Sequence, residues 1–317
     1  MILVAGGTGR LGSHVVRLLT ARGLRVRMLT RSPGRSAHLA SSLVEVVPGD
    51  VSDQEAVTKA MEGVTTVVSA IHGFGGTGHD TPRTIDHQGN GTLITAARTS
   101  GVEHFVLMSV QGAAQDHPIE LFRMKFLAEQ ALQASGLPWT VIRATAFMET
   151  WTQLIGEPLL KKGTTTIFGR GQNPINFVSV CDVAAFVALA VTDAAMRGRT
   201  VEVGGPENLS LRQLADTFEQ ITHRTGARRT VPLPMMRLMS VLMRPIHPRL
   251  ARQIAAGVVM DTRDMTFDAS ERRQRYPMVP WTRLAETLER DYEQARQSVA
   301  GMARDTDAGV SDRSRVS

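Results

Sequence analysis

The stretch AGGTGRLG, residues 5–12, follows directly after the short aliphatic run Ile2–Ala5. Gly6, Gly9 and Gly12 give it a G-x-x-G-x-x-G spacing. Between a strand and a helix, such glycines allow a sharp turn, a close approach of the backbone to a pyrophosphate and tight packing of the helix on the sheet. The free N–H groups at the start of the helix would face the phosphates. The stretch therefore predicts a dinucleotide-binding fold; the alternative is a purely structural glycine turn.

The residues after this stretch alternate between β-branched runs and amphipathic helical patterns, which is the signature of βαβ units on a parallel sheet. Right-handed crossovers between such units give a doubly wound sheet of the Rossmann type. The expected strands are Ile2–Ala5, Arg25–Leu29, Val44–Val47, Thr66–Ala70, Phe105–Ser109 and Trp139–Arg143, and the expected helices are Leu11–Ala21, Gln54–Met61, Gln88–Thr99 and Ile119–Ala134.

The pattern loosens from Phe147 onward. A capping box at Ser210–Gln213 opens a helix that we expect to end at Gly226. The other expected elements are strands over Thr164–Phe168, Asn176–Val180 and Thr200–Val203, an apolar helix over Val183–Val191 and a last helix over about Arg283–Gln297.

The predicted fold class is α/β: a doubly wound parallel-sheet Rossmann fold with a small C-terminal subdomain on the substrate side. Residues 1–150 would form the dinucleotide-binding core. Residues 151–300 would supply the remaining Rossmann elements, interleaved with the smaller substrate or partner subdomain. Residues 301–317 are small, charged and non-periodic, so we expect a disordered tail there.

The composition is that of an ordinary globular protein, with 317 residues of which 42% are hydrophobic and 21% charged. The longest apolar run, Val183–Val191, is far shorter than the roughly 20 residues that cross a bilayer, so no transmembrane segment is expected. Cys181 is the only cysteine and no export signal is visible, so we expect a cytoplasmic protein.

The net charge of +6 is unevenly distributed. Arginines crowd between Arg224 and Arg275, where they alternate with methionines, leucines and valines and few acids accompany them. Such a mix indicates an anionic membrane surface or a protein partner; the alternative is an arginine-fringed helix packed on its own domain. Aromatic residues are almost absent there, so binding of nucleic acid is not expected.

The end of the second expected strand predicts which dinucleotide is bound. NAD-selective sites place an acidic residue there, whereas this chain has Arg31, with Arg35 nearby. A guanidinium pairs well with the extra phosphate of NADP, so we favour NADP(H) over NAD(H); the alternative is that Arg31 stacks on adenine or faces solvent. After the third strand, Asp50 is suited to accept from the adenine amino group, and Asp53 is expected to cap the next helix.

Several motifs together resemble those of the atypical short-chain dehydrogenase/reductases, in particular the NmrA-like, NAD(P)H-binding group. They are GGTGRLG at the start, GDVSD after the third strand, the run DHQGNGTLITAARTSGVEHFVLMS, Lys125, FVSVCDVAAFVALAV and VEVGGPENLSLRQLA. The resemblance covers about residues 1–290 and implies a Rossmann fold that binds NAD(P)H. The group includes quinone-reductase-like enzymes, redox-sensing regulators and relatives of an accessory subunit of respiratory complex I.

The resemblance also implies catalytic residues, with one departure. The family trio is Ser or Thr, Tyr and Lys, with Tyr and Lys four residues apart on a helix. Ser109 and Lys125 match the first and last members, but Leu121 occupies the tyrosine position. The only tyrosines, Tyr276 and Tyr292, lie near the carboxyl end. By resemblance, Lys125 would hold the nicotinamide ribose or transfer a proton itself, and Ser109 would form hydrogen bonds near the nicotinamide.

The missing tyrosine limits the reactions that the protein is expected to catalyse. General acid catalysis accelerates a reaction by about 10²–10⁴-fold, whereas hydride transfer is performed mainly by the cofactor. A nucleotide-sugar epimerase, which needs a proton shuttle, is therefore not expected. We expect a reductase of a small apolar, quinone-like acceptor, which takes its proton from water or another side chain. The alternative is a non-catalytic NADP(H)-sensing regulator or an assembly or scaffold factor.

The family resemblance implies that the substrate binds among the loop after the fourth strand, the segment after the sixth and the carboxyl-terminal part. The segment residues would line a pocket or pack in the core, and the loop histidines, His72 and His79, would donate protons or lie in solvent. No metal is implied, because His72, His79, His87 and Asp80 lack a recognisable ligand spacing. The expected substrate residues are His72, Phe74, Phe147, Met148 and Trp151, and the expected cofactor residues are Gly6, Gly7, Thr8, Gly9, Arg10, Leu11, Gly12, Arg31, Arg35, Asp50, Val51, Ala70, Ile71, Ser109 and Lys125.

Overall fold

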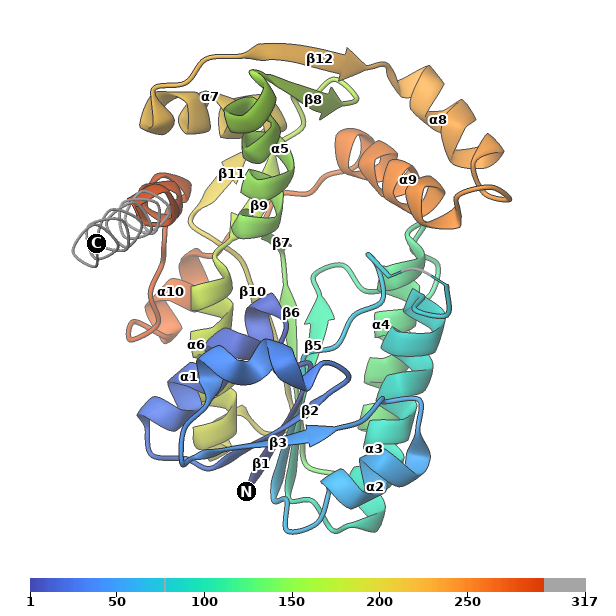
Figure 1. Cartoon of the computed structure of the whole chain (residues 1–317), viewed down its shortest axis with the longest axis vertical. Coiled ribbons are helices and arrows are strands. Elements are labelled where there is room, and N and C mark those ends of the chain that lie inside the picture. Colours follow the sequence, from blue (N-terminus) through green and yellow to red (C-terminus); the bar gives the residue numbers. More distant parts are fainter. Residues whose placement is uncertain (77, 294–317) are drawn as a thin grey trace, which may run out of the picture.

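A seven-stranded parallel sheet forms the centre of the computed structural model, which describes residues 1–76 and 78–293 (Figure 1). Its strands are β1 (Ile2–Ala5), β2 (Val26–Thr30), β3 (Val44–Pro48), β4 (Thr66–Ser69), β5 (His104–Val110), β6 (Trp139–Ala144) and β10 (Arg199–Val203). Their order is β10-β6-β5-β4-β1-β2-β3, and each neighbouring pair runs parallel. This order confirms the doubly wound α/β fold that the sequence predicts.

Helices cover both faces of this sheet (Figure 1). They are α1 (Arg10–Ala21) and α6 (Val180–Thr192) on one face, and α2 (Gln54–Ala60), α3 (Asn90–Thr99) and α4 (Glu120–Gln133) on the other. In β1, Ile2 and Val4 pack toward α1 and α6, whereas Leu3 and Ala5 pack toward the opposite layer, because successive side chains of a strand point to opposite faces. Both faces are buried, which explains the continuous apolar run in the sequence.

The winding of the sheet reverses between β1 and β4. The chain leaves β1 for α1 on one face and leaves β4 for α3 on the other. Ligands of doubly wound sheets bind outside the carboxyl ends of the strands at this switch point. The glycine stretch and the loop after β4 both start there.

A smaller mixed region lies over this carboxyl edge (Figure 1). It holds a three-stranded sheet of order β11-β9-β7 and a parallel pair, β12 and β8. Its core contains Ile155, Phe177, Leu214 and Phe218. The elements of this part of the chain are β7 (Ala146–Phe147), α5 (Met148–Lys162), β8 (Thr164–Phe168), β9 (Ile175–Val178), β11 (Glu207–Leu209), α7 (Leu211–Thr222), β12 (Ala227–Val231), α8 (Leu233–Leu242), α9 (Pro248–Thr262) and α10 (Ser270–Arg275).

Two expected helix caps are present. Asp53 Oδ1 accepts hydrogen bonds from the N–H groups of Glu55 and Ala56, 3.0 and 3.1 Å away, at the start of α2. Ser210 and Gln213 form the reciprocal capping box at the start of α7. Both caps satisfy N–H groups that have no partner inside their helix.

Several expected boundaries differ from the structure by one to four residues, and two of these differences have a clear local cause. α7 ends at Thr222 rather than at Gly226, because His223 adopts the left-handed conformation, with φ of 52°, and stops the helix. The strand expected over Asn176–Val180 ends at Val178, because Ser179 is already the N-cap residue of α6.

Several short helical segments and some of the later helices are not predicted by the sequence, although α6 and α7 are. Among them, α5, α8 and α9 lie in the smaller region, and η2 (Pro82–Gly89), a π-type segment, leads into α3 where a loop was expected. Two further segments are η1 (Pro33–Leu39) and η3 (Ala194–Met196). Residues 284–293 are helical, as the start of the expected last helix, whereas its end and the expected tail over 301–317 lie outside the described residues.

Candidate dinucleotide and substrate site

The glycine stretch after β1 forms a turn that requires glycine at two positions. Gly6 has a φ of +84°, and a Cβ there would lie 2.8 Å from the Ala70 carbonyl oxygen. A Cβ on Gly12 would lie 2.1 Å from the Gly6 carbonyl oxygen. The Gly9 N–H closes the turn by donating to that same oxygen over 2.9 Å. The turn therefore lies directly against the end of β4 and the first turn of α1.

The first turn of α1 presents backbone N–H groups that a ligand can use. Gly9 is the N-cap residue and provides no side-chain cap, and the first turn contains no acidic residue. The N–H groups of Arg10, Leu11 and Gly12 have no acceptor within the helix, as at any helix start. Together with the glycine turn, these N–H groups fit the pyrophosphate of an NAD(P) cofactor.

The side chains of the glycine stretch contact neighbouring elements. Arg10 donates to Gln153 on α5, which joins the turn to the smaller region. Thr8 Oγ1 lies 3.1 Å from Thr30 Oγ1 at the end of β2. The remaining positions pack inward: Gly7 lies against the Met28 side chain and Leu11 is buried in the core.

Arg31, directly after β2, pairs with two carboxylates. Its Nη1 lies 2.8 Å from both carboxylate oxygens of Asp80, on the loop after β4, and 3.5 Å from Asp50 Oδ2. The hydrogen bond to Asp80 raises the pKa of the guanidinium. The Arg31 side chain is still 53% exposed. A phosphate can therefore reach it, in competition with Asp80 and Asp50.

The other residues expected near the adenosine differ in exposure. Arg35 is exposed on η1, and Val51 is buried in the core. Asp50 accepts from Ser52 N and Oγ, over 2.8 and 2.7 Å. Burial raises the pKa of Asp50, but the Ser52 hydrogen bonds and Arg31 outweigh it and lower that pKa overall.

Lys125 lies buried at the same edge of the sheet, in an ion pair with Asp86. Its Nζ is 2.9 Å from Asp86 Oδ1 and donates to the Ile71 carbonyl oxygen over 2.9 Å. The Lys125 side chain is 4% exposed and that of Asp86 0%. Asp86 Oδ2 accepts from Gly73 N over 2.8 Å. Within the described chain, the Ile71 carbonyl takes one of the three ammonium N–H donors. Among the described residues, Asp86 Oδ1 has no hydrogen-bond partner and meets Lys125 as an ion pair only, so N–H donors remain for a ligand.

Sequence reasoning did not single out Asp86. It lies in η2, where the Asn90 side-chain amide donates to its carbonyl oxygen over 2.7 Å. Asn90 Oδ1 in turn accepts from Ser69 Oγ over 2.6 Å, which ties η2 to the end of β4. The only hint in the sequence is that Asp86 and Asn90 fall in DHQGNG, a part of the motifs that carry the family resemblance.

Ser109 lies near the end of β5, and its hydroxyl already has an acceptor. It donates to Glu129, which lies on α4 one turn after Lys125. Arg143 of β6 also binds Glu129, with Nε and Nη2 at 3.0 and 2.6 Å from its two carboxylate oxygens. These contacts with Glu129 raise the pKa of Arg143. The Ser109 oxygen can therefore accept a bond from a ligand, while its proton is held within the protein.

The tyrosine position of the family holds Leu121, half-buried in the first turn of α4. The neighbouring Phe122 stacks on His117, with ring centroids 4.1 Å apart. Tyr276 is buried with the α1–α6 layer, on the opposite face of the sheet from α4, and its hydroxyl contacts Met196. Tyr276 therefore does not take the place of the missing phenol beside Lys125.

His72 follows Ile71 and interacts electrostatically with the Lys125–Asp86 pair. The residue is exposed, yet the protein around its imidazole desolvates the ring and lowers its pKa. Asp86 opposes this shift and Lys125 adds to it. His72 is thus a titratable group that a molecule entering from solvent can reach. The other loop histidine, His79, is exposed.

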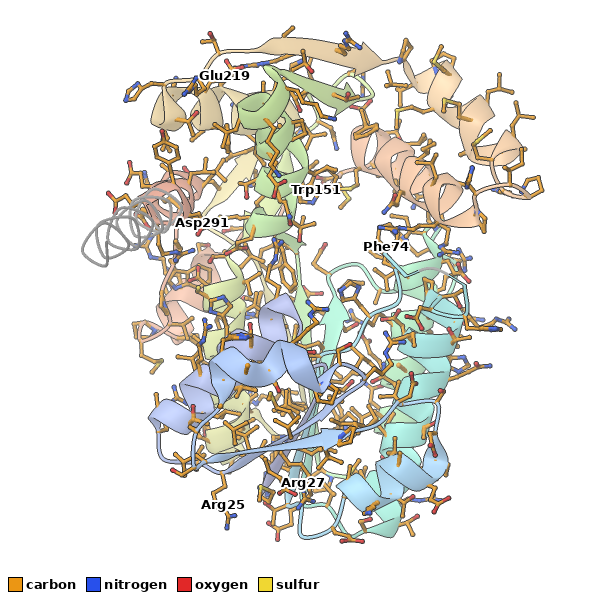
Figure 2. The ribbon with its side chains drawn as sticks, viewed as in Figure 1. Arg25, Arg27, Phe74, Trp151, Glu219 and Asp291 are labelled. Atoms are coloured by element: carbon orange, nitrogen blue, oxygen red, sulfur yellow. The ribbon has the colours of Figure 1, made fainter. Side chains whose placement is uncertain are left out.

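The loop after β4 extends from the Lys125 pair to the smaller region. Phe74 on this loop is half-buried and lies beside α9 (Figure 2). The Arg252 side chain of α9 donates to the Gly76 carbonyl oxygen over 3.4 Å. Figure 2 also labels Trp151, on α5 across from this loop.

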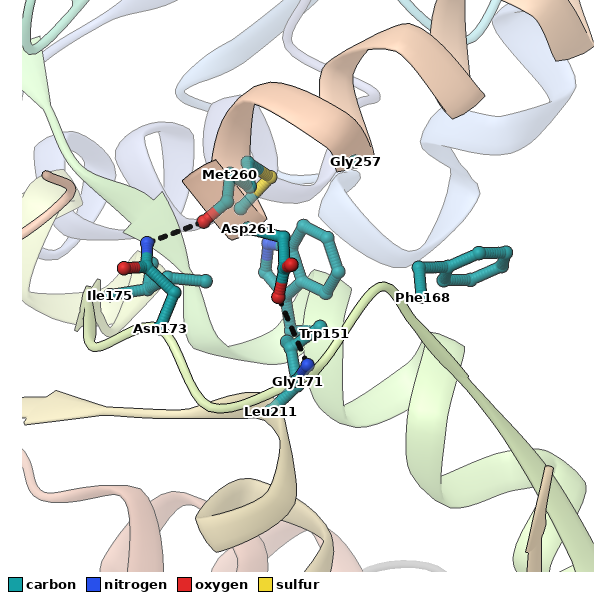
Figure 3. Close-up of a pocket in the computed structure, with 9 residues that line it drawn as sticks. All are labelled: Trp151, Phe168, Gly171, Asn173, Ile175, Leu211, Gly257, Met260 and Asp261. Atoms are coloured by element: carbon teal, nitrogen blue, oxygen red, sulfur yellow. Dashed lines mark hydrogen bonds between the residues drawn. The ribbon is translucent and has the colours of Figure 1, made fainter. Parts of the chain in front are cut away.

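Of the three substrate residues expected after β6, two pack in hydrophobic cores and one also lines a cavity. Met148 is fully buried in the core of the smaller region, and Phe147 is half-buried against the α1–α6 layer. Trp151 packs edge-on against Phe177, with centroids 6.3 Å apart. It also lines a small cavity (Figure 3) with Phe168, Gly171, Asn173, Ile175, Leu211, Gly257, Met260 and Asp261. The cavity volume of about 10 Å³ is at the lower limit for one water molecule, so it is no ready substrate pocket.

Residues 1–76 and 78–293 contain neither a metal-binding cluster nor a helix that could span a membrane. No group of three or more His, Cys, Asp and Glu side chains there is arranged to hold a metal ion. Likewise, none of the helices in these ranges has the length and apolar character needed to cross a membrane.

Comparison with known proteins identifies the family. The model of the NmrA-like family matches residues 1–267. The chain is 28% identical over 274 residues to the photosystem II assembly factor Ycf39 of Trieres chinensis, covering 84% of this chain and 85% of that protein. It is 32% identical over 216 residues to the NAD(P)H azoreductase of Xenophilus azovorans, covering 68% and 71%.

A solved structure shares the fold. The NADPH-dependent quinone oxidoreductase of Escherichia coli, complexed with NADPH, superimposes with a TM-score of 0.74 over 92% of this chain and 100% of that one, at 22% identity. With its glycine turn, its Lys125 and a family model that matches most of its length, this chain belongs to the NmrA-like family.

Proposed function

We propose that this protein is an NADP(H)-dependent reductase of a small apolar, quinone-like acceptor that works without a catalytic tyrosine. The observation that carries the proposal is the glycine turn with its uncapped α1 amides, at the same sheet edge as the buried Lys125–Asp86 pair. A dinucleotide in a Rossmann site runs along this edge, with its phosphates at the helix start. The single cysteine of the chain fits a reducing, cytoplasmic setting.

Arg31 supports NADP(H) rather than NAD(H). It stands where NAD-selective sites carry an acid, its side chain is 53% exposed, and a guanidinium binds a phosphate well. Asp80 and Asp50 hold that guanidinium, so the 2′-phosphate has to compete with them. The NADPH held by the Escherichia coli relative agrees with this preference.

The nicotinamide cofactor supplies the hydride. Lys125, fixed by Asp86 and the Ile71 carbonyl, would hold a ribose hydroxyl with an N–H that the Ile71 carbonyl does not use. The Ser109 oxygen can accept from the nicotinamide amide. Water is the proton source of this proposal, and His72, exposed beside the Lys125–Asp86 pair, can relay a proton, although its lowered pKa favours the neutral ring. An electron-poor acceptor such as a quinone suits this arrangement, because its reduced oxygens are weak bases that need little help from a general acid.

The second candidate is a non-catalytic NADP(H)-sensing regulator or assembly factor. Leu121 favours it, since the residue that transfers protons in the wider superfamily is missing. Within the family, the relative from Trieres chinensis is an assembly factor, whereas the one from Xenophilus azovorans is an azoreductase. Family membership therefore fits both candidates, and turnover separates them.

The test begins with titrations of the purified protein with NADPH, NADP⁺, NADH and NAD⁺, followed by a quinone panel monitored at the nicotinamide absorbance. We expect tight NADPH binding and acceptor-dependent oxidation that Lys125→Ala abolishes. Arg31→Ala should weaken NADPH and leave NADH unchanged, which makes NADH the internal control. Tight binding without turnover across the panel would favour the sensor. Failure to bind all four dinucleotides would contradict both candidates.

A further inference from the structure

Helix α8 is apolar on two faces, and only one of them is covered. Met236 and Ser240 are buried, and the Met236 side chain lies against α9 at Gly257. The outer face carries large hydrophobic side chains that are 42–64% exposed, and the turn after the helix and the start of α9 continue it. We call this the α8 surface; it consists of Met235, Leu238, Val241, Leu242, Ile246 and Leu250.

Most of the exposed large hydrophobic side chains among the described residues belong to the α8 surface. Six of the ten exposed large hydrophobic side chains among the described residues lie within 235–250. A helix that is apolar all round is normally covered on all sides, and contiguous apolar patches on soluble folds mark interaction sites. α8 also lies at the periphery of the smaller region (Figure 1). Its outer face therefore needs a covering surface.

The charged residues of the segment that carries this surface are all arginines, of which Arg228 pairs with acidic side chains of α7. Residues 220–260 contain seven arginines and no aspartate or glutamate. Arg237, Arg244 and Arg249 are exposed, and they alternate in sequence with the members of the α8 surface. Exposed aliphatic side chains interspersed with exposed arginines are the arrangement of segments that lie in the interface of an anionic bilayer.

The same charges argue against other occupants. A second copy docked through this face would bring two sets of arginines together without an acid to offset them. A protein partner is favoured by tyrosine and tryptophan anchors, whereas the α8 surface contains only methionine, leucine, valine and isoleucine. Lipid tails accept aliphatic side chains of any shape, and anionic headgroups neutralise the arginines.

We propose that the α8 surface docks this protein on an anionic lipid bilayer, with α8 in the plane of the interface. The contact between Arg252 of α9 and the Gly76 carbonyl would then hold the loop after β4 close to the bilayer. That position suits an apolar acceptor dissolved in lipid, but docking itself does not depend on turnover and is tested without cofactor or acceptor.

The test is co-sedimentation of the full chain with vesicles of phosphatidylcholine alone or with phosphatidylglycerol added. One variant, Leu238→Gln with Val241→Gln, reduces the apolar face; another, Arg237→Gln with Arg244→Gln, reduces the charge. The matched controls are Leu154→Gln and Met278→Gln, which are exposed elsewhere, and Arg25→Gln with Arg98→Gln. Arg25 lies at the far end of the molecule from the smaller region (Figure 2).

We expect binding to the anionic vesicles only. The arginine variant should bind about 25-fold more weakly, at about fivefold per arginine. The apolar variant should bind the anionic vesicles at least about tenfold more weakly, and the controls should bind like the unmodified protein. Binding should also weaken with added salt.

Three outcomes would overturn the proposal. The first is absence of binding to anionic vesicles. The second is binding that the apolar variant leaves unchanged, since that is adsorption by charge alone. The third is sedimentation of the free protein as a dimer that Leu238→Gln with Val241→Gln dissociates, since a second copy then covers this face.

Discussion

Lys125 and Asp86 each stabilise the charge of the other, because both side chains are buried. Removing one member of a buried ion pair leaves the other charge uncompensated. We therefore expect Asp86→Asn to lower the free energy of unfolding by about 3–5 kcal/mol, measured by denaturant titration. The double variant Asp86→Asn with Lys125→Met should recover much of this loss, because it removes both charges.

The chain offers an exposed pair as the control for this prediction. Lys161 and Glu157 lie 2.7 Å apart on α5, with side chains 70% and 44% exposed. Glu157→Gln should cost less than about 0.5 kcal/mol, because solvent screens the pair. Equal losses in Asp86→Asn and Glu157→Gln would show that burial does not govern the Lys125–Asp86 pair.

If NADP(H) binds as proposed, Asp80 would compete with its 2′-phosphate for Arg31. An exposed ion pair of this kind is worth about 0.2–1 kcal/mol. Asp80→Asn should therefore tighten NADPH binding by up to about fivefold and leave NADH binding unchanged, as measured by fluorescence titration. Weaker NADPH binding in this variant would mean that Asp80 positions Arg31 for the phosphate instead of competing with it.

His104 gives the protein a pH-dependent stability. It is buried beside Thr140, with Nε2 at 2.9 Å from the hydroxyl oxygen, and burial lowers its pKa to about 4. The unfolded chain takes up the proton near pH 6.5, so stability falls as the pH drops from about 6.5 to 4 and the total loss is about 3 kcal/mol.

The measurement for His104 is the free energy of unfolding at pH 7, 5.5 and 4. His104→Gln keeps a donor toward Thr140 but has no proton to take up. The loss between pH 7 and 4 should therefore be smaller in the variant by about 3 kcal/mol. Parallel pH profiles for the two proteins would count against His104 as the titrating group.

At the scale of elements, α5 and α7 approach closely at a glycine. A Cβ on Gly156 would lie 2.1 Å from the Phe218 ring. Gly156→Ala should destabilise the protein by about 1–3 kcal/mol through overpacking, despite the higher helix propensity of alanine. Gly91→Ala in α3 is the matched control, because no atom beyond its chain neighbours and its own helix backbone lies within 4 Å of its Cβ position, and it should stabilise by about 0.5–1 kcal/mol. Thermal unfolding shows whether each substitution lowers or raises the unfolding temperature. Stabilisation by both substitutions would contradict this packing.

At the scale of the whole molecule, the proposed cofactor site lies where the main sheet and the smaller region meet, through contacts such as Arg10 with Gln153 and Arg252 with Gly76. A ligand that binds only the folded chain stabilises it by about 2.7 kcal/mol at 100 times its Kd. NADPH should therefore raise the unfolding temperature in a concentration-dependent way, and NADH should do so less at equal concentration. Equal shifts for the two cofactors would argue against a preference for NADP(H).

The sequence by itself determined the doubly wound sheet, the glycine turn and the caps at Asp53 and Ser210. These features rest on local signals, since side-chain periodicity, turn geometry and capping each involve residues close together in the chain. The family followed from the same short motifs and was confirmed over residues 1–267.

Only the tertiary structure decided which partners meet. It pairs Lys125 with Asp86 and places Glu129 where it accepts a hydrogen bond from Ser109. It also buries Met148 in the core and leaves the outer face of α8 uncovered. An acidic residue in a sequence does not reveal whether it is buried, and a helix that is apolar on both faces does not reveal which face is covered. Burial arises from packing between segments far apart in the chain, and that packing sets the charges and exposed surfaces on which the proposed functions depend.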